Sequence, residues 1–391
     1  MKLFRIYEYK GGFVRSRILG LPIVKKGYVL TLLVAGLPIA QRKTYLTQTT
    51  GGGVIYDFVY RIFGFSVFKT FKYKKATRSS LFLYHNDLLN QTFFKMSDSE
   101  IFEKAQKLCE NMDLQSQNIV YQIIFRTKLA ALSPSKKIFR LTQHEKKSLE
   151  YLDSDFYPRI CEITPEVFYY EGYFLPIRHF EVSVFYYKHG LDSFSSQTLA
   201  KIKNLDVIDV GGFIGDSALI FQSFTDKNIY SFEATSHNYN LMLQTLKLNN
   251  TNRIVPVKKG LGSKKTKMNI NILNTLSARS SLIADNNHLG DTKSEEIELI
   301  TLDSYVKEHD LKIGLIKVDI EGFEMEFLKG AKETICSQKP AMILSIYHQA
   351  SDFFDIKPLL ESWNLGYTFR VYKPADYSIS FETTLMCEVL D

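Results

Sequence analysis

The stretch L-D-V-I-D-V-G-G-F-I-G-D-S at 205–217 decides the fold of this chain. An apolar run leads into Asp209, a turn with glycines follows, and Ser217 opens a segment whose apolar residues have helical spacing. Glycines let a backbone turn tightly and approach a ligand closely, and the first turn of a helix presents free N–H groups. The stretch therefore predicts a nucleotide-type ligand site at the head of an α/β sheet.

The spacing of the glycines differs from the dinucleotide fingerprint G-x-G-x-x-G, which binds a pyrophosphate. Three residues separate Gly211 from Gly215, and an acidic residue accompanies the turn. A carboxylate there would repel a phosphate and suits a cationic ligand with hydroxyl and amino groups. Eighteen residues after Gly215, a second apolar run at 228–232 ends at Glu233, whose carboxylate can accept hydrogen bonds from both hydroxyls of a ribose.

Together these features predict binding of S-adenosylmethionine. The residues that we expect to bind this cofactor are Asp209, Gly211, Gly212, Phe213, Gly215, Asp216, Ser217, Glu233 and Ala234.

A second stretch with charged residues is L-I-K-V-D-I-E-G-F-E at 315–324. Lys317, Asp319 and Glu321 alternate, so we expect them to share one face of a strand. Three charges on one face of a central strand are costly unless they are paired or used. A further apolar run at 341–347 ends at His348. Because ligands bind beyond the carboxyl ends of parallel strands, these strand ends predict one shared site.

Residues from about 176 to 390 resemble the FkbM-type methyltransferases. The matching stretches are V-I-D-V-G-G-F-I-G-D-S at 207–217, F-E-A at 232–234, I-T-L-D-S-Y-V at 300–306, I-K-V-D-I-E-G-F-E at 316–324, L-K-G-A at 328–331 and I-L-S-I-Y-H at 343–348. The resemblance implies a class I (Rossmann-like) methyltransferase fold with a doubly wound sheet, and O-methylation of sugars or small natural products. One departure is Ala234, where the family usually has proline, and the stretch 258–262 offers no acid to meet the adenine.

The reaction requires a hydroxyl oxygen in line with the sulfonium methyl and a base that takes its proton. Asp319, Glu321 and His348 are the candidate bases, and we expect Lys317 to pair with one of the two carboxylates. Asp319 and Glu321 could instead hold Mg²⁺, which prefers oxygen ligands. We assign no residue to a metal at this point.

The charge distribution separates a basic segment at 1–80 from the rest of the 391 residues. In the rest we expect a mainly helical region with a connector at 81–165, and the resemblance implies the methyltransferase domain at 166–391. Residues 1–80 hold 15 Lys and Arg, 14 Phe and Tyr, and two acidic residues, although the whole chain has a net charge of +7. The four cysteines are scattered and have no metal-binding spacing, which indicates a reduced, cytoplasmic setting.

The basic segment contains a weak repeat at 18–26, 34–43 and 62–69, in which a short apolar turn precedes basic residues. Its longest apolar run, at 28–40, is too short to span a bilayer. One interpretation is contact with an anionic membrane surface, which would place the protein on the inner face of the cytoplasmic membrane. The other is a solvated basic extension. Nucleic-acid binding is not favoured, because no recognition motif accompanies the aromatic residues.

Three functions follow from these patterns. The favoured one is an O-methyltransferase that uses S-adenosylmethionine to methylate a sugar hydroxyl of a cell-surface glycan or its precursor. The others are a non-catalytic, membrane-associated scaffold in glycan assembly and an NAD-dependent oxidoreductase. The spacing of the glycines disfavours the oxidoreductase.

Overall fold

The computed structural model divides the chain into two compact units, residues 1–82 and residues 83–391. Side chains are described for Leu89, Phe93 and residues 95–130, 141–270 and 294–390. Only the backbone is described for residues 6–9, 13–18, 21–26, 29–34, 37–48, 54–62, 65–74, 131–132, 271–273, 280–281 and 292–293.

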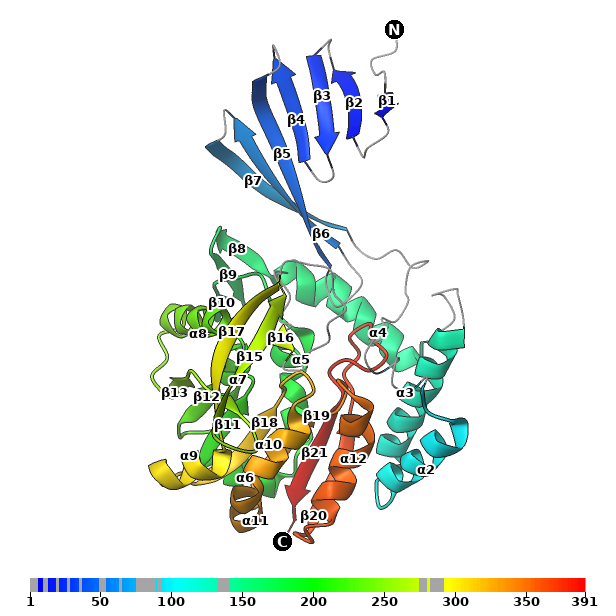
Figure 1. Cartoon of the computed structure of the whole chain (residues 1–391), viewed down its shortest axis with the longest axis vertical. Helices are drawn as coiled ribbons and strands as arrows, with labels where there is room; N and C mark the ends of the chain where they lie inside the picture. Colours follow the sequence, from blue (N-terminus) through cyan, green and yellow to red (C-terminus); the bar gives the residue numbers. More distant parts are fainter. Residues whose placement is uncertain are drawn as a thin grey trace. The chain divides into compact units, whose positions relative to one another are not determined.

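The first unit contains an antiparallel sheet in which seven strands follow one another in chain order (Figure 1). The strands are β1 (Ile6–Tyr9), β2 (Phe13–Ile18), β3 (Leu21–Lys26), β4 (Val29–Val34), β5 (Leu37–Gln48), β6 (Val54–Ile62) and β7 (Phe65–Lys74). The three copies of the repeat contain the junctions β2–β3, β4–β5 and β6–β7, where two residues separate paired strands. Successive hairpins of such a sheet alternate between its two ends, so these three junctions lie at the same end. The predicted membrane contact of residues 1–80 depends on side chains that lie outside the described residues.

The second unit begins with the helices that the sequence predicted. They are α2 (Asp98–Cys109), α3 (Leu114–Leu132) and α4 (Gln143–Tyr151), followed by a small sheet of β8 (Cys161–Thr164), β9 (Val167–Tyr170) and β10 (Tyr173–Leu175). Phe93 stacks on Phe354 with ring centroids 5.4 Å apart, and Lys104 pairs with Asp355 at 2.7 Å. The helical region therefore packs on the last helix of the sheet domain, and its apolar residues belong to the same core.

The central sheet has seven strands in the order β13-β12-β11-β18-β19-β21-β20 (Figure 1). Its strands are β11 (Asp206–Val210), β12 (Ile229–Phe232), β13 (Ile254–Val257), β18 (Ile313–Val318), β19 (Ala341–Ser345), β20 (Tyr367–Tyr372) and β21 (Thr384–Val389). The first five are parallel, and β21 runs antiparallel to both of its neighbours. The order reverses between β11 and β18, and ligands of doubly wound sheets bind at such a switch point. The predicted class I methyltransferase fold is confirmed.

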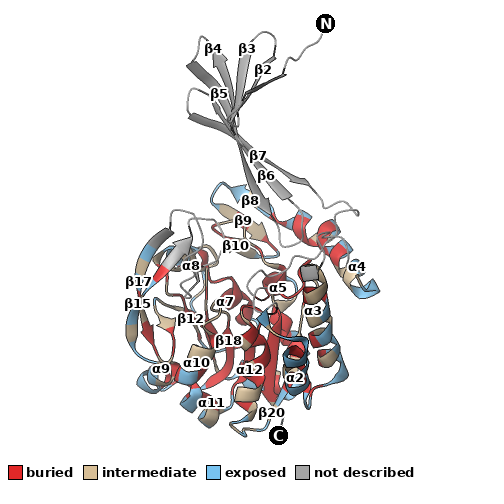
Figure 2. Ribbon diagram, turned by 45° about the vertical axis from the view of Figure 1, so that its right-hand side comes forward, coloured by how far each residue is buried: buried red, intermediate tan, exposed pale blue. Residues whose placement is uncertain are grey.

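Helices cover both faces of this sheet. They are α5 (Val182–Phe185), α6 (Ser196–Lys203), α7 (Asp216–Phe221), α8 (Ser236–Leu248), α9 (Leu302–His309), α10 (Glu324–Gly330), α11 (Lys332–Gln338) and α12 (Ala350–Glu361). Apolar side chains from α9 to α12 share one buried cluster with Ile316 and Val318 of β18. The central strands are buried along their length (Figure 2). A four-stranded sheet of β14 (Gly260–Leu261), β17 (Thr292–Ile300), β15 (Thr266–Leu273) and β16 (Ser280–Ser281) lies beside them.

Candidate active site

The turn after β11 is shaped by its contact with the end of β18. Gly211 has φ +79°, and a Cβ added there would lie 1.8 Å from the backbone oxygen of Asp319. A Cβ on Gly212 would lie 2.0 Å from Oγ of Ser231. From the sequence, these glycines are expected to allow the close approach of a ligand. The structure shows that close packing between neighbouring strand ends also requires them.

Glu233, directly after β12, fixes the conformation of this turn. One of its carboxylate oxygens accepts a hydrogen bond from the backbone N–H of Phe213 at 3.1 Å. The other accepts from the N–H of Thr235 at 2.8 Å and from its hydroxyl at 2.6 Å. Burial raises the pKa of Glu233 to about 7, and these hydrogen bonds limit the rise.

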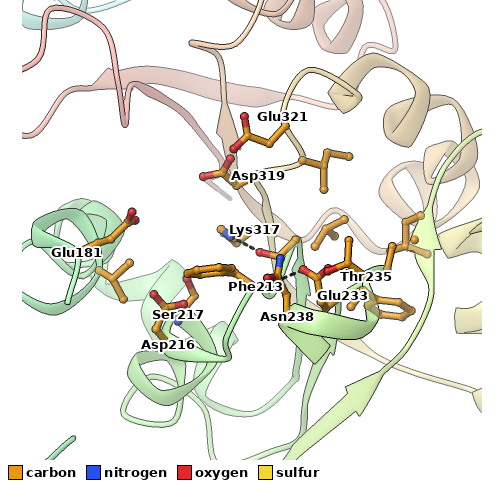
Figure 3. A pocket seen from close by; sticks show the side chains of 18 of the residues that line it. Glu181, Phe213, Asp216, Ser217, Glu233, Thr235, Asn238, Lys317, Asp319 and Glu321 are labelled. Carbon is orange, nitrogen blue, oxygen red and sulfur yellow. Dashed lines mark hydrogen bonds between the residues drawn. The ribbon is translucent and has the colours of Figure 1, made fainter. Parts of the chain in front are cut away.

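One pocket, here called the strand-end pocket, is lined by the glycine turn, by Glu233 and by the residues after β18. A space of about 980 Å³ in and above the pocket contains no protein atoms. This volume includes solvent at the mouth of the pocket, and it is within the range of small-ligand sites. The predicted site residues that line it are Gly211, Phe213, Asp216, Ser217, Glu233, Ala234, Lys317, Asp319 and Glu321. Figure 3 shows Asp319 and Glu321 close together, with Lys317 between them and the turn, and Glu233 beside Thr235 and Asn238.

Other predicted residues do not line this pocket. Asp209 is fully buried, where it accepts a hydrogen bond from Ser231 at 2.7 Å. Gly212 packs against that same serine, and Gly215, with φ +83°, precedes the first residue of α7. His348 lies behind Asp319. These four residues therefore stand behind the pocket wall.

Lys317 lies at the centre of the site and is buried. Its ammonium is 3.5 Å from Oδ1 of Asp209 and donates a hydrogen bond to the carbonyl of Gly211 at 3.1 Å. The predicted ion pair with Asp319 or Glu321 is wrong, because the ion pair forms with Asp209. Burial alone would lower the pKa of Lys317, yet the charges of Asp209 and Asp319 hold it above its usual value. Lys317 is therefore a cation and not a base at neutral pH.

The carboxylates after β18 are not on one strand face, so that prediction was wrong. β18 ends at Val318, and the chain then turns through Glu321 (φ +55°) and Gly322 (φ +98°). Asp319 and Glu321 reach the pocket because the chain changes direction in this turn. They do not reach it as alternate residues of one strand. Burial raises the pKa of Asp319, although His348 and Lys317 oppose the rise.

Two residues outside the predicted set complete this side of the pocket. The hydroxyl of Tyr347 lies 3.2 Å from Oδ2 of Asp319 and 3.2 Å from Oε1 of Glu382. Burial and the nearby Glu181 raise the pKa of Glu382 well above its usual value. Tyr347 lies within the quoted stretch at 343–348 and could have been selected. Glu382 precedes β21 in a segment without a motif, so no signal in the sequence marks it.

The segment at 176–190 supplies the remaining wall. Glu181 and His189 both line the pocket. Glu181 lies 3.0 Å from Nε2 of His179, whereas Nε2 of His189 lies 2.9 Å from Oγ of Ser217. Burial, with the charge of Lys317, lowers the pKa of His189 to about 3, so this ring is neutral.

Asp216, the first residue of α7, faces Glu181 across this part of the pocket (Figure 3). Burial and the charge of Glu181 raise its pKa to about 7. This half of the pocket holds carboxylates where a pyrophosphate site would hold only donors, which fits a cationic ligand.

Comparisons with known proteins identify the domain. A family model described as the methyltransferase FkbM domain matches residues 209–369. "Methyltransferase 1" of Beauveria bassiana (strain ARSEF 2860) is 24% identical over 186 residues, which are 43% of this chain and 74% of that protein. The crystal structure of methyltransferase FkbM from Methylobacillus flagellatus KT is 18% identical and has a TM-score of 0.46. That alignment covers 73% of this chain and 58% of the other.

A further structural neighbour is a protein from Streptococcus mutans in complex with SAH, at 10% identity and a TM-score of 0.31. The alignment covers 50% of this chain and 94% of the other. The family match confirms the resemblance to FkbM methyltransferases that the sequence predicted.

Proposed function

We propose that this chain, whose residues 209–369 form a methyltransferase domain of the FkbM family, transfers the methyl group of S-adenosylmethionine to a hydroxyl group. The observation that carries this proposal is the strand-end pocket, in which the glycine turn and Glu233 face the same space as Asp319 and Glu321. A cofactor half and an acceptor half of one site are therefore adjacent, as an in-line transfer requires.

The residues of the cofactor half fit S-adenosylmethionine. Glu233 would accept hydrogen bonds from the ribose hydroxyls, and Asp216 and Glu181 would face the positive charges of the methionine part. Ala234, Leu261 and Ile270 form an apolar part of the wall that suits the adenine ring. The cofactor supplies an activated methyl group, and the protein orients it.

In the acceptor half we propose Asp319 as the base. As the hydroxyl oxygen forms its bond to the methyl carbon, the carbon–sulfur bond breaks and its electron pair stays on sulfur. The hydroxyl proton passes to Asp319, and the products are a methyl ether and S-adenosylhomocysteine. A raised pKa brings a carboxylate closer to the basicity that proton transfer at neutral pH needs. With no cation bound, His348 has a pKa raised to about 10, because Glu324, Glu321 and Asp319 outweigh its burial, so it is already protonated.

The acceptor that we propose is a sugar hydroxyl of a cell-surface glycan or its precursor. Three carboxyl groups and the Tyr347 hydroxyl surround the acceptor half, and such groups bind hydroxyl-rich ligands. The carboxyl groups are those of Asp319, Glu321 and Glu382. The family resemblance supports the same class of acceptor.

Cofactor binding is testable by calorimetry with S-adenosylmethionine and, separately, NAD. We expect the wild-type protein to bind S-adenosylmethionine and not NAD. Its affinity should fall about tenfold from about pH 8 to about pH 6, because the proton bound by Glu233 with a pKa of about 7 competes with the ribose. Glu233→Ala should weaken binding by about 100-fold or more and reduce the pH dependence, since two hydrogen bonds to a charged group are lost.

The matched control is Glu295→Ala, because Glu295 also bonds the start of α8, through Ser236, but does not line the pocket. It should bind within about threefold of wild type. Preference for NAD would contradict the proposal. If neither cofactor binds, the non-catalytic scaffold becomes the better interpretation.

We also propose that residues 1–80 hold the enzyme on the inner, anionic face of the cytoplasmic membrane. Their 15 basic residues against two acidic ones support this, since each Lys or Arg near such a surface contributes about 1 kcal/mol. In the described part of the chain, none of the helices has the length and apolar character that crossing a bilayer needs.

This membrane contact predicts that the full chain sediments with phosphatidylglycerol vesicles and not with phosphatidylcholine vesicles. High salt should release it, because the attraction is screened. Reversing the charge of Lys72, Lys74 and Lys75 should lower vesicle affinity at least about tenfold, while cofactor affinity stays constant. Equal binding to both vesicle types, or to neither, would show that the basic segment is a solvated extension.

A further inference from the structure

His348 presents an unsatisfied nitrogen behind the acceptor half of the pocket. The ring is 3% exposed, and its Nε2 is buried without a hydrogen-bond partner among the described residues. Its Nδ1 lies 2.9 Å from Oε1 of Glu324, the first residue of α10. A buried polar nitrogen without a partner is costly, so it indicates a ligand that the protein atoms do not supply.

Two carboxylate oxygens face this nitrogen. Oδ1 of Asp319 lies 3.3 Å from Nε2 and Oε2 of Glu321 lies 3.7 Å from it. Donor atoms that surround one divalent cation at about 2.0–2.2 Å are themselves separated by about 3 to 4 Å. Both carboxylate oxygens therefore lie at the separation from Nε2 that ligands of one shared cation have.

We propose that Nε2 of His348, Asp319 and Glu321 form a binding site for a divalent cation. Glu324 completes the arrangement, because it accepts the Nδ1–H of His348 and so turns Nε2 towards the two carboxylates. A carboxylate in this position is typical behind histidines that ligate metals, where it fixes the tautomer and the orientation of the ring. Asp319, Glu324 and His348 form a cluster whose donor atoms lie within 4.8 Å of one another, and Glu321 adjoins this cluster through its 3.7 Å separation from Nε2.

The donor set favours a hard cation such as Mn²⁺ or Mg²⁺, because two of its three protein ligands are carboxylates. Three protein ligands leave positions for water or for a substrate oxygen. Asp319 and Glu321 both line the strand-end pocket, so those positions lie on its acceptor side. If the proposed function holds, the cation would bind the acceptor hydroxyl and lower its pKa, and Oδ2 of Asp319 would remain free of the cation to receive the proton.

The alternative is a cluster that needs no cation. A protonated His348 between Glu324, Asp319 and Glu321 is then held by charge alone, and Mn²⁺ has no site there. A cation at Nε2 would displace that proton into solvent. The two arrangements therefore differ in a direct measurement of metal binding.

The experiment is calorimetric titration of the full chain, saturated with S-adenosylhomocysteine, with Mn²⁺ alone, followed by pulsed electron paramagnetic resonance. We expect one bound Mn²⁺ whose spectrum carries the coupling of an imidazole ¹⁴N. Asp319→Asn should weaken Mn²⁺ binding at least about 100-fold, and His348→Gln should remove the ¹⁴N coupling. Glu324→Gln should weaken binding by about 10- to 100-fold through the orientation of the ring.

The matched control is Glu326→Gln on the same helix, where the side chain pairs with Lys329 away from the pocket. It should bind Mn²⁺ within about twofold of wild type. Unchanged binding of S-adenosylhomocysteine shows that each variant is folded. Failure of Mn²⁺ to bind, or binding without the ¹⁴N coupling, would overturn the proposal. Neither readout depends on methyl transfer, so failure of the metal site and failure of the proposed function are distinguishable.

Discussion

Replacing Asp319 with asparagine is expected to lower kcat about 1,000-fold, because asparagine cannot take the proton of the acceptor hydroxyl. The amide oxygen can still accept the hydrogen bond of Tyr347, so the local structure should be preserved. Affinity for S-adenosylmethionine should change less than about threefold, since Glu233 and the glycine turn bind the cofactor. The measurement is transfer of a tritiated methyl group to the best acceptor in a panel of sugars, with cofactor affinity measured by calorimetry.

The Tyr347→Phe variant distinguishes the contribution of the proposed base, Asp319, from that of its neighbouring hydroxyl. It removes the hydroxyl beside Asp319 and Glu382 but leaves both carboxylates, so we expect kcat to fall only about tenfold. A loss in Asp319→Asn that appears in cofactor affinity and not in kcat would assign Asp319 a structural role. An equal loss in both variants would show that the pair acts as one unit and that Asp319 alone is not the base.

The sequence predicted the parts of the site that depend on local pattern. Apolar runs ending at Asp209 and before Glu233 become β11 and β12, and the switch point between β11 and β18 lies where the glycine turn was found. Parallel strands bring their carboxyl ends to one edge, so Glu233, Asp319 and Glu321 line one pocket although they are far apart in the chain.

Other parts depend on tertiary contacts that no local pattern records. Because β18 ends at Val318, Asp319 and Glu321 do not alternate along a strand as expected. The turn that follows depends on residues with positive φ and on the neighbouring strand. Lys317 pairs with Asp209 of the adjacent strand, since the register of β11 and β18 places these residues side by side. Glu382 reaches the pocket from the loop before β21, the antiparallel strand, and only the complete sheet shows that.

The first residue of the turn also supports a prediction about stability. Gly211→Ala is expected to lower the free energy of unfolding by about 4 kcal/mol, of which about 1–2 kcal/mol comes from the positive φ. The remainder comes from the contact at 1.8 Å with the backbone oxygen of Asp319, which can be relieved only by moving β11 and β18 apart. Because neither partner is a flexible side chain, the strand ends must shift.

Gly366→Ala separates the two contributions, because Gly366 has φ +81° and a Cβ there meets nothing within 4 Å. It should cost only about 1–2 kcal/mol. In thermal unfolding of the full chain, a difference of about 2–3 kcal/mol between the variants corresponds to a midpoint difference of about 4–8 °C. Gly211→Ala should also weaken S-adenosylmethionine binding at least about tenfold, because the displaced strand ends carry both halves of the pocket. Equal unfolding midpoints for the two variants would mean that Gly211 is required only for its positive φ and not for the close contact with Asp319. Lower stability with full cofactor affinity would mean that the strand ends can separate without disturbing the site.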